Sequence, residues 1–87
     1  MEKTYYVYIL ICGDGSLYTG MTDDVPRRVL THNAGKGAKY TRSRLPVQAA
    51  YVEPCPDKSA ALRREMELKR LSHGEKAALI AHGHTEE

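Results

Sequence analysis

Arg28 and His32 are the first pair of side chains in this 87-residue sequence whose types and spacing suit chemistry on a phosphate ester. They stand four positions apart, so in a helix they lie on one face, one turn from each other. A guanidinium donates a forked pair of hydrogen bonds to phosphate oxygens, and an imidazole exchanges protons near neutral pH. His32 would then donate a proton to a leaving oxygen or contact the phosphate. The alternatives are a solvated surface arginine and a half-buried helix histidine.

Glu65 is the third candidate, because a helical projection places its carboxylate among apolar positions. The apolar arc of this predicted helix consists of Ala61, Leu62, Met66 and Leu68. At about 100° per residue, Glu65 falls within that arc, about 40° from Ala61, whereas Glu67 faces the opposite side. A carboxylate that faces the core is costly unless it is paired or coordinates a cation. Glu65 is therefore either a metal ligand or the partner of Lys69, one helical turn later.

Tyr8 and Tyr18 form a two-tyrosine site only if they share one face of a sheet. They flank a Gly-Asp-Gly loop, which predicts a β-hairpin. A two-residue turn would put the tyrosines on opposite faces, because strand residues alternate in direction. A three-residue loop pairs Cys12 with Ser16 and makes the tyrosines diagonal neighbours on one face. Gly15 suits the left-handed position that such a loop needs, so we expect this second register.

The elements that must position these side chains follow the order ββαβαα. Runs of aromatic and β-branched residues predict strands at 5–12, 16–21 and 47–53, the last stopped by Pro54 and Pro56. Helices are predicted from an N-cap at Asp23 or Asp24 to a stop at Asn33 and Gly35, from Asp57 or Ser59 to about Leu71, and from the capping-box pattern of Ser72 and Glu75 to Ile80. The order predicts an α+β fold, a three-stranded antiparallel sheet flanked by helices, in one domain of residues 4–82 with a mobile tail at 83–87.

The charge of the chain is concentrated in one segment. Residues 27–44 hold six basic and no acidic side chains, whereas the rest of the chain carries a net −4. The basic residues are Arg27, Arg28, Lys36, Lys39, Arg42 and Arg44. Such a block is typical of a site for a polyanion, and a solvated loop is the alternative.

The remaining composition excludes several classes of protein. The longest apolar run, residues 5–12, is far shorter than the roughly 20 residues that cross a bilayer, so no membrane partner is expected. Cys12 and Cys55 are too few for a disulfide framework and lack the spacing of zinc ligands. We expect a cytoplasmic protein with reduced cysteines.

These features together resemble the GIY-YIG nuclease domain, in particular its small stand-alone bacterial members of the UPF0213 type. Tyr6-Val7-Tyr8 resembles the first motif, with Tyr8 in the signature tyrosine position, and Tyr18-Thr19-Gly20 resembles the second. The family's arginine falls on Arg28, eight residues after Gly20, a position often held by His or Tyr falls on His32, and the metal-binding glutamate falls on Glu65. The resemblance extends over about residues 5 to 80.

The resemblance implies metal-dependent hydrolysis of phosphodiester bonds. Tyr8 would act as general base, with its pKa lowered by Arg28 and the metal, and Tyr18 would position the water or a phosphate. Glu65 would hold one Mg²⁺ or Mn²⁺ ion, bound weakly without substrate. The substrate would be nucleic acid, DNA rather than RNA, contacted by Arg27, Lys36, Lys39, Arg42 and Arg44. A role in repair or recombination is expected, with other proteins supplying substrate specificity.

The sequence also departs from the family pattern at three places. Tyr6 replaces the glycine of the first motif, and Thr19 replaces the usual aliphatic residue of the second. A polar residue, usually Asn, that several endonuclease members carry about 15 residues after the glutamate has no counterpart, because the only Asn is Asn33. The alternative is therefore a non-catalytic nucleic-acid-binding module that keeps the GIY-YIG scaffold.

Overall fold

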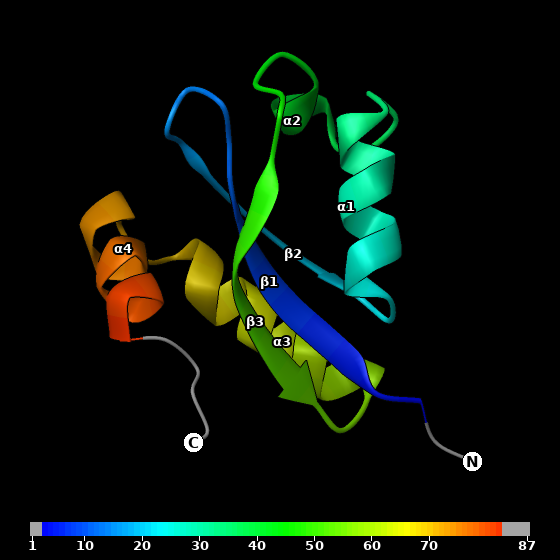
Figure 1. Cartoon of the computed structure of the whole chain (residues 1–87). Helices are drawn as coiled ribbons and strands as arrows, with labels where there is room; N and C mark the ends of the chain where they lie inside the picture. The colour runs from blue at the N-terminus through cyan, green and yellow to red at the C-terminus, as the bar shows by residue number, and fades with distance from the viewer. Residues whose placement is uncertain (1–2, 83–87) are drawn as a thin grey trace.

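The computed structural model of the chain describes residues 3–82, and within them it confirms the α+β fold (Figure 1). The elements are β1 (Tyr5–Ile11), β2 (Leu17–Thr22), α1 (Val25–Asn33), α2 (Lys39–Arg42), β3 (Gln48–Cys55), α3 (Lys58–Lys69) and α4 (His73–His82). The three strands form an antiparallel sheet in the order β2-β1-β3. The predicted mobile tail, residues 83–87, lies outside the described residues. No helix within residues 3–82 has the length and hydropathy needed to cross a membrane.

The β1–β2 hairpin has the register that places both motif tyrosines on one face. Tyr8 pairs with Gly20, and Leu10 pairs with Tyr18. The three-residue loop is closed by the Cys12 amide, which donates to the Ser16 carbonyl at 2.9 Å. Its third residue, Gly15, has a φ of 85°, the left-handed conformation that favours glycine. The turn thus sets which side chains face the site.

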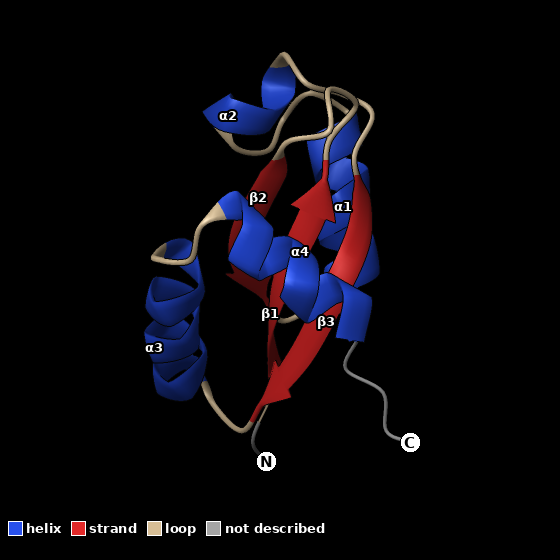
Figure 2. Cartoon of the chain, turned by 90° about the vertical axis from the view of Figure 1, so that its left-hand side faces the viewer, coloured by secondary structure: helices blue, strands red, loops and turns tan. Residues whose placement is uncertain are grey.

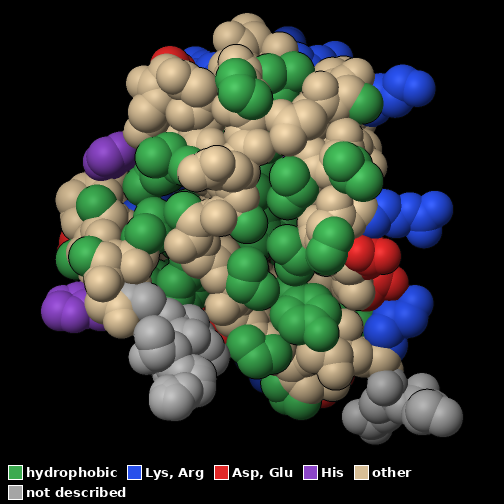
Figure 3. Space-filling model, viewed as in Figure 1, with side chains coloured by type: hydrophobic (Ala, Val, Ile, Leu, Met, Phe, Trp, Pro, Cys, Tyr) green, Lys and Arg blue, Asp and Glu red, His purple; other side chains and the backbone are tan. Residues whose placement is uncertain are grey.

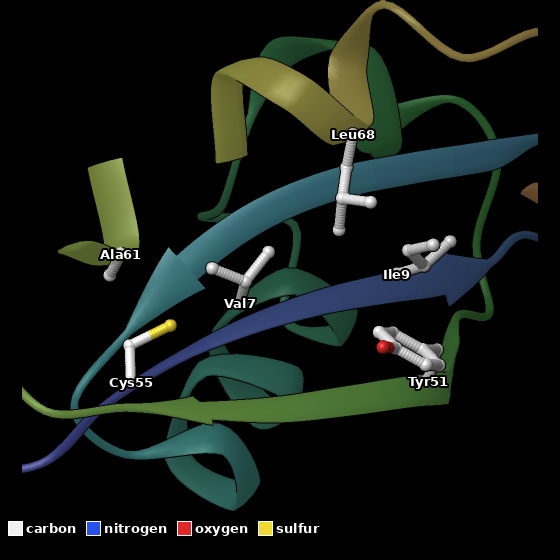
Figure 4. Packing of buried hydrophobic residues seen from close by; sticks show 6 residues of the cluster. All are labelled: Val7, Ile9, Tyr51, Cys55, Ala61 and Leu68. Atoms are coloured by element: carbon white, nitrogen blue, oxygen red, sulfur yellow. The ribbon is translucent and has the colours of Figure 1, made fainter. Parts of the chain in front are cut away.

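Helices cover both faces of the sheet, and each face has its own core (Figure 2). Val7 and Ile9 of β1 point toward α3, where Leu68 packs against the strands (Figure 4). Tyr8 and Leu10 point to the opposite face, which α1 covers with Val29. Because neighbouring residues of β1 alternate between two covered faces, residues 7–10 are all buried. The rigid central strand therefore carries the candidate tyrosine.

The predicted helix caps fix where the helices begin. Asp24 accepts a hydrogen bond from the Arg27 amide at 3.1 Å, and Asp57 accepts one from the Ala60 amide at 2.8 Å. Ser72 and Glu75 form both bonds of the capping box, at 3.1 and 2.8 Å. Each cap satisfies amides that a helix start otherwise leaves unpaired, so the local sequence determines these boundaries.

Three predictions of the sequence are wrong in detail. The short helix α2 was not expected. Strand β3 does not stop before Pro54 but continues to Cys55, because β3 is an edge strand, where the missing proline N–H costs no bond to a neighbour. Leu62 and Met66, at 44% and 57% exposure, do not face the core, so the buried stripe of α3 is narrower than predicted and is centred on Ala61 and Leu68.

Side-chain contacts hold the basic segment, residues 27–44, against the hairpin end of the sheet. The Asn33 side chain bonds both the amide and the carbonyl of Val47, at 2.7 and 2.9 Å. Arg44 pairs with Asp14 of the hairpin loop at 3.1 Å, and its carbonyl accepts the Gly13 amide at 2.7 Å. The segment between α1 and β3 is thus held against the strands that carry the tyrosines.

Candidate active site

A buried chain of polar side chains connects β1, α1 and α2. The Tyr8 hydroxyl lies 3.2 Å from Nε2 of His32, and the Nδ1 of His32 lies 2.9 Å from the Thr41 hydroxyl. Thr41 also donates to the Ala38 carbonyl at 2.9 Å. Tyr8 is 1% exposed, and His32 and Thr41 have no exposed surface. The structure therefore brings together two of the predicted site residues and adds Thr41, which the sequence analysis missed.

The hydrogen-bond pattern determines which ring nitrogen of His32 carries the proton. Burial, and secondly the charge of Arg28, lower the pKa of His32 below its usual 6.5, so the ring is neutral at pH 7. The single hydroxyl hydrogen of Thr41 goes to Ala38, whose carbonyl can only accept. All three contacts are then satisfied only if Nδ1–H donates to Thr41 and Tyr8 donates to Nε2. Nε2 is thus an acceptor poised for the phenolic proton.

Two glycines make room for this chain of side chains. A Cβ on Gly20 would lie 2.5 Å from the Tyr8 hydroxyl oxygen, and a Cβ on Gly37 would overlap the His32 ring at Nδ1. Side chains at either position would push Tyr8 or His32 away from its partner. The requirement for glycine in the second motif follows from the close approach of the Tyr8 phenol to the β2 backbone. Gly37 carried no recognisable signal in the sequence.

Tyr18 joins the same group through its ring. It contacts His32 edge to face, with centroids 5.5 Å apart, and stacks on Tyr40 of α2 at 5.9 Å. The guanidinium of Arg44 lies over the Tyr40 ring, 3.9 Å from the ring centroid. Tyr18 is half-buried, so one edge remains open to a ligand. Its shared face with Tyr8 confirms the geometric condition for a two-tyrosine site.

Arg28 acts directly on the Tyr8 phenol. Burial raises the pKa of Tyr8 above 10, and the hydrogen bonding and charge of the half-buried Arg28 guanidinium offset only part of that effect. Arg28 alone therefore does not produce the lowered pKa that was expected from Arg28 together with a metal, because desolvation of the phenolate outweighs one neighbouring cation. Arg27 points to solvent, as predicted.

Glu65 lies at the border of the α3 core, with its side chain 16% exposed. Its carboxylate pairs with Lys69 at 3.3 Å, the alternative contact expected from the sequence. Its negative charge also reaches Tyr8 and contributes to raising the pKa of that phenol. Since α3 packs against β2, whose Gly20 supports the Tyr8 hydroxyl, Glu65 approaches the phenol from the other side of this edge strand.

Glu65 offers a single carboxylate as a ligand for a metal ion such as Mg²⁺. The described residues contain no cluster of three or more His, Cys, Asp or Glu side chains of the kind that holds a zinc ion. One partly shielded carboxylate oxygen beside a phosphate site suits Mg²⁺, which keeps most of its waters and takes few protein ligands. The residues therefore fit a weakly held hard cation at Glu65, which would have to displace Lys69.

The remaining basic residues divide into two kinds. Arg27, Lys36, Lys39 and Arg42 are exposed, whereas the Arg44 guanidinium is engaged with Asp14 and Tyr40. Figure 3 shows Lys and Arg side chains projecting beside α1 and near α2, while the face over β3 is mostly apolar. Free positive charge thus lies on the same side of the sheet as the α1 residues of the candidate site.

The fold is that of the GIY-YIG family, and the chain belongs to this family, because the family model of the GIY-YIG catalytic domain matches residues 4–77. GIY-YIG is a family of nucleases. Within it the chain is similar to UPF0213 proteins. It is 52% identical to the one from Natronomonas pharaonis, covering 93% of this chain and 95% of that protein, and 51% identical to the one from Staphylococcus saprophyticus, covering 95% and 100%.

A solved structure supports the same placement. The solution structure of the UPF0213 protein from Bacillus halodurans superposes with a TM-score of 0.58 at 50% identity, covering 90% of this chain and 83% of that one. The structural similarity therefore extends over most of the chain.

Proposed function

We propose that this protein is a metal-dependent endonuclease that hydrolyses phosphodiester bonds in nucleic acid, with Tyr8 and His32 together forming the general base. The observation that carries the proposal is the 3.2 Å contact between the Tyr8 hydroxyl and Nε2 of His32, with Nδ1 held by Thr41. This arrangement gives the phenolic proton a defined acceptor. A site that activates a water nucleophile needs such a proton acceptor within hydrogen-bond reach.

The relay moves protons without forming a free phenolate. As a water oxygen bonds to phosphorus, its proton passes to the Tyr8 oxygen while the phenolic proton passes to Nε2 of His32. The bond from phosphorus to the leaving oxygen breaks, and that oxygen takes its proton from solvent. The imidazolium keeps both of its N–H bonds, to Tyr8 and Thr41. The raised pKa of Tyr8 is compatible with this route, because the phenol never bears a full negative charge.

Arg28 both binds the phosphate and uncovers the base. The Tyr8 hydroxyl is buried, and among the neighbours that act on it Arg28 and Tyr18 are partly exposed. A phosphate that draws the guanidinium toward its own oxygens removes this cover and lets water reach the phenol. The forked donors then neutralise the charge that develops in the transition state.

Glu65 is the residue that would hold the cation. Mg²⁺ or Mn²⁺ there supplies positive charge against the transferring phosphoryl oxygens. Lys69 pairs with this carboxylate at 3.3 Å when no cation is bound.

The exposed basic residues give affinity without reading sequence. Lys36, Lys39 and Arg42 would contact phosphates of the backbone, which positions the strand but does not select it. We propose DNA in preference to RNA, a cytoplasmic setting in repair or recombination, and partner proteins that select the substrate.

The second candidate is a nucleic-acid-binding module without cleavage. It is favoured by one observation, the 1% exposure of Tyr8, because a general base that water cannot reach cannot activate a water molecule for attack. This candidate keeps the basic segment and Arg28 as binding residues and leaves the Tyr8–His32 pair as a structural contact.

Cleavage assays separate the two candidates. Labelled single-stranded, flapped and branched DNA and RNA are incubated with Mg²⁺ or Mn²⁺ and with wild type, Glu65→Ala, Arg28→Ala or the control Glu67→Ala, whose exposed carboxylate pairs with Arg64. The endonuclease requires metal-dependent cleavage that both site variants lose and the control keeps. Salt-sensitive binding with no cleavage of any substrate would establish the binding module instead.

A further inference from the structure

A surface hollow of about 230 Å³ lies beside the candidate site, at the hairpin end of the edge strand β2. Its lining residues are Leu17, Tyr18, Thr19, Tyr40, Lys69 and Lys76. Tyr18 belongs to the active-site group and Lys69 contacts Glu65, so the hollow adjoins the proposed reaction centre. Its other polar groups have no role in the mechanism above.

Thr19, one of the residues that line this hollow, has a hydroxyl that is not used as a donor within the described residues. Thr19 is 2% exposed, and its Oγ1 is buried without a hydrogen-bond partner among the described residues. A buried hydroxyl left unpaired costs roughly 1–3 kcal/mol, so a residue of this kind calls for an explanation other than packing. A valine would fill the same space at no such cost.

The charge in the hollow is positive. Lys69 is held by Glu65, but no ion pair to Lys76 is present within the described residues. Burial, and secondly the charge of Lys69, lower the pKa of Lys76 from 10.5. Among the lining residues, Lys69 and Lys76 carry ammonium groups and Tyr18, Thr19 and Tyr40 carry hydroxyls, and all five side chains can donate a hydrogen bond. A negatively charged group that only accepts hydrogen bonds, such as a phosphate, suits a hollow lined by such residues.

The size of the hollow limits what it can take. Sites for whole small molecules measure about 300–1,000 Å³, so a hollow of about 230 Å³ suits one phosphate and part of its sugar. The Tyr40 ring is already engaged, because it stacks on Tyr18 and the Arg44 guanidinium lies over it, 3.9 Å from the ring centroid. The hollow is therefore suited to the backbone of a strand and not to its bases.

We propose that this hollow binds a phosphate of the nucleic-acid strand next to the scissile phosphate, through Lys76, Lys69 and the Thr19 hydroxyl. The inference rests on the proposed function, since it makes the β2 edge the track of the strand that is cut. The phosphate is an internal phosphodiester or a terminal monophosphate, which share this chemistry.

Binding without cleavage tests the inference. The isotope-labelled protein is titrated in EDTA with a thymidine hexanucleotide, once with a free 5′ hydroxyl and once with a 5′ phosphate, and amide shifts are followed by NMR. We expect shifts at Tyr18, Thr19 and Lys76. Lys76→Gln should weaken binding about tenfold, whereas Lys58→Gln, at the exposed start of α3, should change it less than twofold. Equal shifts with both oligonucleotides identify an internal phosphate; shifts with the phosphorylated one alone identify a terminal phosphate.

Thr19→Val gives an independent result. If the hydroxyl serves the ligand, this variant is more stable to urea than wild type but binds the hexanucleotide more weakly. Equal or tighter binding by Thr19→Val, or equal binding by Lys76→Gln and Lys58→Gln, overturns the inference and leaves the endonuclease proposal intact. Absence of any oligonucleotide binding by wild type also overturns the inference, whereas the endonuclease proposal is overturned only by the absence of cleavage in the assay with Mg²⁺ or Mn²⁺.

Discussion

The hydroxyl of Tyr8 lies 3.2 Å from Nε2 of His32, across the interface between the central strand and the first helix. Both side chains are buried, and the neutral imidazole offers an acceptor to the phenolic proton. The contact joins two positions 24 residues apart that sequence resemblance assigns separate roles. In the proposed mechanism, this contact makes Tyr8 and His32 together the general base.

Thr41 is expected to act on catalysis through His32. Thr41→Val removes the acceptor of Nδ1–H, so the ring loses its fixed tautomer, and cleavage should fall at least tenfold with unchanged oligonucleotide affinity. Thr41→Ser, which keeps the hydroxyl, should restore most of the rate. Ring ¹⁵N chemical shifts of His32 report the tautomer. We expect the proton on Nδ1 in the wild-type protein and a mixture of the Nδ1–H and Nε2–H tautomers in Thr41→Val. A valine variant with the wild-type rate and shifts would remove Thr41 from the relay.

The stability of the fold should depend on the protonation of His32. Its folded pKa is below 6.5, so the unfolded chain binds the proton more readily. Stability is then complete above about pH 6.5 and declines as the pH falls toward the folded pKa, by at most about 1.4 kcal/mol per pH unit for one proton. Urea titrations between pH 5 and 8 measure this slope.

A matched surface variant isolates the contribution of His32. His32→Gln should flatten the slope, and His82→Gln, which removes an exposed histidine at the end of α4, is the control. Asp14 and Asp23, whose pKa values lie below 3.8, affect stability only at lower pH. A flat profile in wild type would mean that His32 titrates in the fold as it does in the unfolded chain.

Gly20 should tolerate no side chain if the Tyr8 hydroxyl is to stay on His32. In Gly20→Ala the new methyl group would lie 2.5 Å from that oxygen, so the phenol must move, with a cost of about 1–3 kcal/mol in stability and loss of most cleavage. Gly74→Ala is the control, because its Cβ meets nothing nearer than 3.9 Å in helix α4, and it should stabilise the protein by up to about 1 kcal/mol. Thermal unfolding and cleavage rates measure both effects.

The exposed basic residues should determine the salt dependence of binding. Each of Lys36→Gln, Lys39→Gln and Arg42→Gln should reduce the slope of log K against log salt by about 0.7–0.9, for all sequences alike. Arg44→Gln should instead lower stability with little change in slope, because its guanidinium already contacts Asp14 and Tyr40. If Arg44→Gln reduces the slope as much as the others, its guanidinium leaves Asp14 when DNA binds.

Local sequence was sufficient for most of the fold. The hairpin register that places Tyr8 and Tyr18 on one face followed from Gly15 and a three-residue loop. The helix starts followed from Asp24, Asp57 and the Ser72–Glu75 capping box. Helix α2 could not be predicted, because Lys39–Arg42 has no apolar periodicity. Tertiary contacts of Thr41 and Tyr40 hold it, and such contacts leave no trace in a local pattern.

The site was predictable where residues lie at fixed spacings and not where distant segments meet. Resemblance identified Tyr8, Tyr18, Arg28, His32 and Glu65. It could not identify Thr41 or Gly37, which matter only because α2 folds back over His32. The effect of burial on the pKa of Tyr8 could not be predicted for the same reason, since burial is a property of the assembled fold.

The cleavage rate of Tyr8→Phe shows whether the Tyr8 hydroxyl and His32 together form the general base. The variant keeps the ring and its packing and removes only the hydroxyl that faces His32. With Mg²⁺ and the best-cleaved oligonucleotide, we expect the wild-type protein to cleave and Tyr8→Phe to cleave at a rate at least about 100-fold lower. Both proteins should bind the oligonucleotide equally well. A wild-type rate for Tyr8→Phe, or no cleavage by wild type on any DNA or RNA, would contradict this proposal.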